Sequence, residues 1–104
     1  MKALLIPVNE PMIIVEFGAN VSLIALQKLV EGMIAPITVK HKRRDAVAWI
    51  NEEGLDLDME YNDRASELLD CYIVGPVVVT GMDHQGMTLS APRWVQRMTK
   101  QKGE

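Results

Sequence analysis

The feature that most limits the possible folds of this chain is its longest apolar run, YIVGPVVVTG, from Tyr72 to Gly81. The run is rich in β-branched residues, whose side chains lose rotamer freedom in a helix and pack well on a pleated sheet. It is too short to cross a bilayer, so it predicts a central strand that is buried on both faces. Pro76 has no N–H to donate and follows Gly75, and this pair predicts a bulge or a change of pairing partner.

Length and composition are typical of one small soluble domain. The chain has 104 residues, 48% of them hydrophobic and 24% charged, which is enough for one core. We expect a single α+β domain over residues 1–100 and a frayed tail over 101–104. Pro7 and Pro11 break the apolar N-terminus before a signal peptide could form, and no apolar run suits a membrane span, which favours a cytoplasmic protein.

Short apolar segments predict the other strands. These segments lie at residues 3–8, 12–17, 37–39, 46–50 and 87–89. The first two predict a hairpin, and a polar loop over 40–45 joins the next two. Residues 55–61 alternate leucine, methionine and tyrosine with acidic residues, which predicts a half-buried extended segment with its acidic face in water.

Three segments predict helices. The first has leucines at 23, 26 and 29 with Met33 on the same stripe, Ser22 as its N-cap and an end near Gly32. The second is short and extends from its cap Asn62 to Leu69, and the last begins around Ser90 and Pro92.

The order of these elements lacks the regular alternation of a doubly wound sheet. It predicts an α+β fold with a mixed or mainly antiparallel sheet of about five or six short strands, on which two main helices pack. These are the first helix and the C-terminal helix. We expect Leu26, Trp49, Val77 and Val79 to lie in the core.

The net charge of −3 hides an uneven layout along the chain. Residues 45–70 contain one Lys or Arg against nine Asp or Glu, whereas residues 1–44 contain six against three and residues 71–104 four against two. Because an acidic block repels phosphate, only the basic flanks could approach nucleic acid, and nucleic-acid binding is not favoured.

No residue pattern predicts catalysis, a metal or a cofactor. Acidic residues at 56, 58 and 60 resemble part of a calcium-binding loop, but Tyr61 stands where that loop needs glycine for its sharp turn. His41 and His84 have no partner at metal-ligand spacing. Cys71, the only cysteine, is expected to be a buried and inert side chain. We therefore do not expect an enzyme.

Two basic clusters supply the candidate partner-binding residues. Arg43 and Arg44 belong to the polar loop, and their charges are also typical of an ordinary solvated loop. Arg93, Trp94 and Arg97 belong to the last helix, and tryptophan and arginine are the residues most often found at binding hot spots. Anchoring in the core is the plainer explanation of Trp94.

Five segments together resemble a known family. They are residues 1–8 (MKALLIPV), 22–32 (SLIALQKLVEG), 51–54 (NEEG), 62–65 (NDRA) and 73–79 (IVGPVVV). The chain up to Leu89 is similar to a small family of bacteriophages and actinobacteria known only as domain of unknown function 3846. The last helix departs from the acidic ending typical of that family. The resemblance supplies no catalytic or ligand residue and implies an accessory protein of a phage or mobile element in the host cytoplasm.

The leading hypothesis is a non-enzymatic accessory protein that binds a host protein or itself. The alternative is a binder of a small nucleotide-like ligand, and the third hypothesis is weak nucleic-acid binding by the basic flanks. The opposite charges of the acidic block and the flanks, with the open edges of a small sheet, favour a homo-oligomer. Its simplest form would be a two-fold dimer.

Calcium or zinc, added at moderate excess, is expected to leave the melting temperature of the protein unchanged. A metal that binds the folded state must stabilise it by mass action. Thermal melts with and without the metal measure this, and a clear rise would contradict our interpretation of residues 56–60.

Overall fold

The computed structural model describes residues 1–18 and 23–100, so the expected N-cap at Ser22 and the expected tail at 101–104 lie outside the described residues. Its strands are β1 (Lys2–Ile6), β2 (Ile13–Glu16), β3 (Ile34–Val39), β4 (Ala46–Asn51), β5 (Val77–Met82) and β6 (Thr88–Leu89). Its helices are α1 (Leu23–Val30), α2 (Asp63–Leu69) and α3 (Arg93–Gln96), which continues as the 3-10 helix η1 (Arg97–Lys100). The predicted α+β fold is confirmed.

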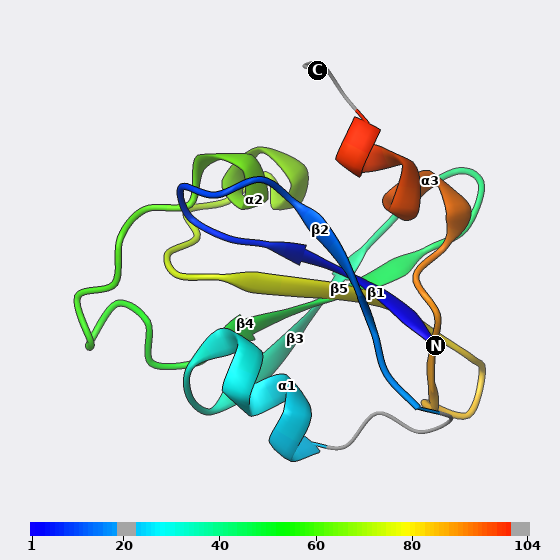
Figure 1. Cartoon of the computed structure of the whole chain (residues 1–104), viewed down its shortest axis with the longest axis horizontal. Helices are drawn as coiled ribbons and strands as arrows, with labels where there is room; N and C mark the ends of the chain where they lie inside the picture. Colours follow the sequence, from blue (N-terminus) through cyan, green and yellow to red (C-terminus); the bar gives the residue numbers. More distant parts are fainter. Residues whose placement is uncertain (19–22, 101–104) are drawn as a thin grey trace.

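The sheet has the spatial order β2-β1-β5-β4-β3, with β6 paired to β5 outside this path. The strand pairs in the described residues are all antiparallel. β5 is the central strand, as predicted, because Val78 stands opposite Leu5 of β1 on one side and Trp49 of β4 on the other. Figure 1 shows β5 crossing the middle of the molecule between these neighbours.

Helices cover both faces of the sheet, which is why β5 is apolar at consecutive positions. On one face Val78 packs in a cluster with Leu26 and Val30 of α1. On the other face Val77 and Val79 belong to a cluster that also includes Ala65 of α2 and Val95 of α3, so the two shorter helices cover this face. Figure 1 shows α1 on the opposite side of the sheet from α2 and α3.

Of the four core residues expected from the sequence, Leu26, Val77 and Val79 are confirmed, and Trp49 is only partly buried. Val77 and Val79 have no exposed surface and Leu26 is 4% exposed. Trp49 is partly buried against the α1 cluster, and its indole Nε1 donates a hydrogen bond to Oγ1 of the buried Thr80 at 2.9 Å. Because the indole N–H and the threonine hydroxyl satisfy each other, neither group is left unpaired in this half of the core.

Asn62 links three parts of the fold through one buried amide. Its Oδ1 accepts from the backbone N–H of Ala65 at 3.0 Å, which confirms the predicted helix cap of α2. Its Nδ2 donates to the carbonyls of Ile6, at the end of β1, and Gly75, just before β5, both at 2.9 Å. The amide therefore fixes α2 onto the two central strands.

The predicted change of pairing partner at Gly75 and Pro76 is confirmed. Val74 forms an isolated antiparallel bridge with Tyr61, whereas β5 begins after the break and pairs with β1 and β4. Gly75 has a φ of 80°, a conformation that a residue with a Cβ adopts only under strain, and a Cβ there would lie 2.9 Å from the Met59 side chain.

The first helix is shorter than predicted and the third strand is longer. α1 ends at Val30, Glu31 takes a left-handed φ of 68°, and the N–H of Gly32 bonds back to the carbonyl of Gln27. This turn aims Met33 into solvent, so Met33 does not join the leucine stripe. β3 then begins at Ile34 rather than at residue 37, because an edge strand tolerates Pro36.

The prediction of a half-buried extended segment over residues 55–61 is wrong for residues 55–58, and only the end of the segment pairs with another strand-like segment, through the bridge between Tyr61 and Val74. Residues 52–58 form successive turns, in which Leu57 N–H bonds to Glu53 O and Met59 N–H to Gly54 O. The Asn51 side chain starts these turns by accepting the N–H of Glu53 at 2.8 Å. Local hydrogen bonds therefore decide the conformation, and the leucines of this segment project outward.

Cys71 is exposed, so the expectation that it is buried is also wrong. It follows Asp70, which ends α2 in a left-handed conformation with a φ of 57°. The chain turns away from the core at this cap and returns to it only at Ile73, which is 4% exposed.

Replacement of Asn62 by alanine is expected to lower the free energy of unfolding by about 2–4 kcal/mol, because it leaves buried backbone partners without a hydrogen bond. Urea denaturation followed by circular dichroism measures the loss. The matched control is Asp63→Ala, an exposed neighbour, for which we expect a loss of less than ~1 kcal/mol. Equal losses for the two variants would contradict the linking role of Asn62.

Candidate functional site

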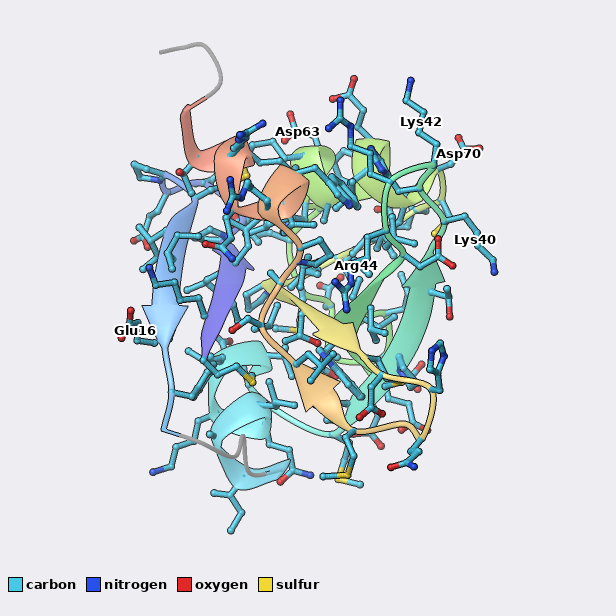
Figure 2. All side chains as sticks on the ribbon, turned by 90° about the vertical axis from the view of Figure 1, so that its right-hand side faces the viewer. Glu16, Lys40, Lys42, Arg44, Asp63 and Asp70 are labelled. Atoms are coloured by element: carbon cyan, nitrogen blue, oxygen red, sulfur yellow. The ribbon has the colours of Figure 1, made fainter. Side chains whose placement is uncertain are left out.

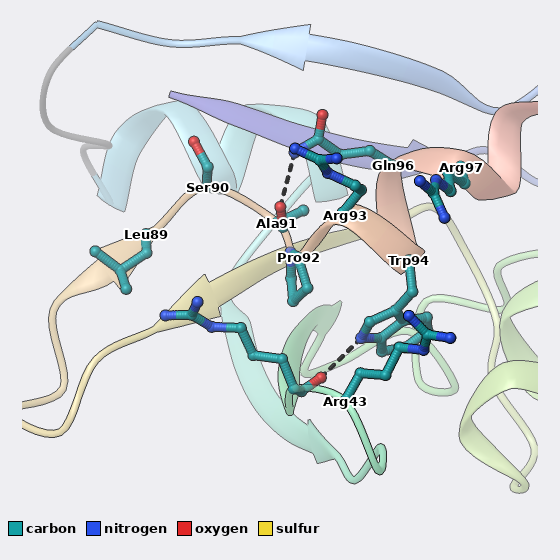
Figure 3. Close-up of a pocket in the computed structure, with 10 residues that line it drawn as sticks. Arg43, Leu89, Ser90, Ala91, Pro92, Arg93, Trp94, Gln96 and Arg97 are labelled. Carbon is teal, nitrogen blue, oxygen red and sulfur yellow. Dashed lines mark hydrogen bonds between the residues drawn. The ribbon is translucent and has the colours of Figure 1, made fainter.

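A hollow with a volume of about 900 Å³ lies where the β3–β4 loop meets the start of α3, and we call it the arginine hollow. Its lining residues are Arg43, Arg44, Leu89, Ser90, Ala91, Pro92, Arg93, Trp94, Gln96 and Arg97. Figure 2 faces this end of the molecule, with Arg44 near the middle of the view. Figure 3 shows how the lining side chains lie in it.

One wall of the hollow is fixed to the start of β1. Ala91 N–H donates to the carbonyl of Lys2 at 2.8 Å, and Ser90 Oγ accepts from the backbone N–H of Lys2 at 2.9 Å. Val95 has no exposed surface, so α3 is held in the core through this residue. The remaining positions of this short helix are then free to face the hollow.

Arg43 and Arg44, from the loop between β3 and β4 (residues 40–45), form the opposite wall. Asp45 shapes this loop, because its carboxylate accepts the backbone N–H of His41 at 2.9 Å and lies 3.3 Å from the ammonium of Lys40. The His41 hydrogen bond is the main cause that holds the pKa of the Asp45 carboxyl below its ordinary value. Through these two contacts the carboxylate keeps the loop folded back on itself.

Trp94 joins the two walls. Its Nε1 donates to the carbonyl of Arg44 at 2.7 Å, and its ring stacks on the imidazole of His41 with ring centroids 4.0 Å apart and planes 9° from parallel. Figure 3 shows the indole of Trp94 between α3 and the loop. One half-buried side chain thus holds in place two segments that are about fifty residues apart in the sequence.

The hollow is strongly positive and has no carboxylate in its lining. It holds four arginines, at positions 43, 44, 93 and 97, and all four are exposed. The ion pairs in the described part of the chain are Lys2–Glu16 and Lys40–Asp45, so none of these guanidinium groups is paired within residues 1–18 and 23–100. Like charges without partners repel one another and attract an anionic group.

The structure brings together all five residues that the sequence suggested for partner binding, Arg43, Arg44, Arg93, Trp94 and Arg97. In the sequence they form two separate clusters, and the basic loop over residues 40–45 contains no Phe, Trp or Tyr. In the folded chain, Trp94 of α3 brings an aromatic ring to this loop. The strand register, in which Val47 of β4 stands opposite Thr80 of β5, is what brings the two segments together. This register places the β3–β4 loop beside the segment that leads from β5 into α3.

Sequence reasoning missed the part of the lining between β6 and α3, Leu89 to Pro92. The sequence did indicate that a helix starts at Ser90 and Pro92. It did not indicate which other segments lie beside that start. No group of three or more His, Cys, Asp or Glu side chains in the described residues is arranged to hold a metal. None of the helices in this part of the chain is long and apolar enough to span a membrane.

Comparison with family models shows where the chain belongs. A model described as domain of unknown function (DUF3846) matches residues 1–102, so the chain is a member of this family. The match extends past Leu89 and includes α3, so both walls of the arginine hollow lie within the matched region. Neither the curated proteins nor the solved structures contain a match to the chain.

Replacement of Trp94 by alanine is expected to destabilise the protein by about 2 kcal/mol, because it removes the ring stacking and a hydrogen bond to the loop. The matched control Trp94→Phe keeps a stacking ring and loses only the N–H donor, so we expect it to cost roughly half as much. Urea denaturation followed by circular dichroism measures both. Unchanged stability of the alanine variant would show that Trp94 does not hold the walls together.

Proposed function

We propose that the chain is a non-enzymatic interaction protein and that the arginine hollow is the surface with which it binds a host protein. The observation that carries this proposal is the set of four arginines that line one concavity without an acidic partner in the described residues. An acidic segment of a partner would supply the missing carboxylates, and arginine binds carboxylates through two parallel hydrogen bonds.

The lining supports a binding role rather than catalysis. It contains arginine, apolar, amide and hydroxyl side chains, and none of its residues is a histidine, cysteine, lysine, aspartate or glutamate that could take up a proton near neutral pH. Trp94 and the arginines are the residue types that most often dominate binding energy at interfaces. An accessory role for a phage or mobile element in the bacterial cytoplasm rests on the family resemblance, and the hollow supports the interaction part of that role.

A small nucleotide-like ligand is the second candidate for the hollow. Its volume of about 900 Å³ falls in the range of ~300–1,000 Å³ typical of small-molecule sites. Arginine also binds phosphate in the same bidentate way as carboxylate. Nucleic acid is a weaker candidate, since the acidic block would repel a long polyanion that extends beyond the hollow.

Affinity capture from bacterial lysate tests the leading proposal. The tagged wild-type chain is compared with Arg93→Ala/Arg97→Ala, which removes two exposed guanidinium groups, and with Lys28→Ala, which removes an exposed positive charge outside the hollow. We expect at least one host protein that the wild type and Lys28→Ala retain and the double variant loses, because only the double variant lacks the proposed carboxylate partners. Identical captures by all three would overturn the proposal.

Thermal melts with adenosine triphosphate separate the second candidate from the first. A concentration-dependent rise in the melting temperature of the wild type, absent in Arg93→Ala/Arg97→Ala, would favour a nucleotide-like ligand. No rise for either protein would leave a macromolecular partner as the favoured occupant.

A further inference from the structure

The segment from Glu52 to Asp58, which we call the acidic leucine loop, displays two leucines among four carboxylates. Leu55 is 69% exposed and Leu57 55% exposed. The carboxylates, at positions 52, 53, 56 and 58, are exposed as well. No contact within the described residues explains why leucines alternate with aspartates here, since the extended segment that the pattern predicted does not form.

The loop is already ordered in the free chain. The N–H of Asp58 donates a hydrogen bond to the carbonyl of Leu55 at 3.1 Å. At the base of the loop, the N–H of Gly54 donates to the carbonyl of Asn51 at 3.2 Å. Gly54 is buried so tightly that a Cβ there would lie 2.8 Å from the Val74 side chain. An ordered loop loses little conformational entropy when it docks, which favours its use as a binding element.

The acidic leucine loop and the arginine hollow lie at opposite ends of the molecule. In Figure 1 the longest axis is horizontal, the green loop projects at the left, and the β3–β4 loop and α3, which form the hollow, lie at the right. The chain extends 33 Å along this axis, so its own loop cannot reach its own hollow. Each chain therefore presents an acidic, apolar projection at one end and a basic concavity with apolar walls at the other.

We propose that the acidic leucine loop of one copy docks in the arginine hollow of a second copy. The carboxylates of the loop would pair with the guanidinium groups that lack partners in the described residues, and the two leucines would pack on Leu89, Pro92 and Trp94. The occupant is a second copy because the loop offers carboxylates, which the hollow lacks, together with leucines that match the apolar part of its lining. This inference rests on the proposed role of the hollow as a binding surface.

Docking of this kind is head-to-tail. Because the loop projects from one end and the hollow faces the other, as Figures 1 and 2 show, a first contact leaves one loop and one hollow free, and further copies can add at either end. The two-fold dimer that the sequence suggested as the simplest oligomer would need both surfaces on the same side of the chain. A host protein that enters the hollow would compete with the loop, so self-association and partner binding would exclude each other.

A complementation experiment with two variants tests the inference. Arg93→Glu/Arg97→Glu disables the hollow, and Leu55→Ser/Leu57→Ser disables the loop at exposed positions. Light scattering at ~100 µM protein in low salt measures the mass. We expect the wild type to grow beyond a dimer with concentration, each variant alone to remain monomeric, and an equimolar mixture to form dimers only, because one intact loop then meets one intact hollow. In 1 M salt, where the screening length is about 3 Å, the wild-type association should weaken.

The control variant is Ile24→Ser, which removes an exposed apolar side chain on α1, away from both surfaces, and is expected to associate as the wild type does. Circular dichroism confirms that each variant is folded. A monomeric wild type, variants that associate alone, or a monomeric mixture would each overturn the inference. These measurements use purified protein only, so loss of the inference would leave the host-protein proposal to be decided separately by the lysate capture.

Discussion

The burial of β5 on both faces is the constraint on which the rest of the structure depends. A strand in which Val77, Val78 and Val79 all lack exposed surface requires a layer of apolar side chains above and below the sheet. One layer comes from α1 and the other from α2 and α3. Each helix is too short to be stable alone, so its position is decided by the face of β5 that it covers.

The polar groups near the centre of the sheet then fix how these layers meet. Asn62 bonds to the ends of the two central strands and caps α2 with the same amide, and Trp49 bonds to Thr80 across the neighbouring strand pair. No buried side-chain nitrogen or oxygen in the described residues lacks a partner. Because a buried polar group without a hydrogen bond is costly, these pairs select one arrangement of the strands and helices over others of similar apolar burial.

Features encoded by neighbouring residues could be predicted from the sequence, and features that depend on strand pairing could not. The central strand, the break at Gly75 and the cap at Asn62 each follow from local chemistry. The arginine hollow does not, because it requires the register that brings Val47 opposite Thr80 and so sets the β3–β4 loop beside α3. The five candidate residues were chosen by residue type, and that they line one concavity appears only in three dimensions.

The alternation of leucine and aspartate misled for a different physical reason. A period of two predicts a half-buried strand only where a neighbouring strand offers a ladder, and the pairing there is limited to a bridge between Tyr61 and Val74. Asn51 instead offers its side-chain oxygen to the N–H of Glu53, and local turns satisfy the backbone first. The alternation therefore does not indicate a strand here, and Leu55 and Leu57 are exposed in the folded chain.

Magnitudes indicate how strong head-to-tail docking can be. Complete burial of two leucines contributes at most roughly 3–6 kcal/mol, and these leucines are already partly covered. Loss of translational and rotational freedom on association costs about 4–15 kcal/mol, so the leucines alone would not hold two copies together. The rest of the favourable free energy must come from the guanidinium–carboxylate pairs, and salt weakens these pairs by screening their charges. Such a contact is weak and reversible, and an acidic partner with a larger complementary surface would displace the loop from the hollow.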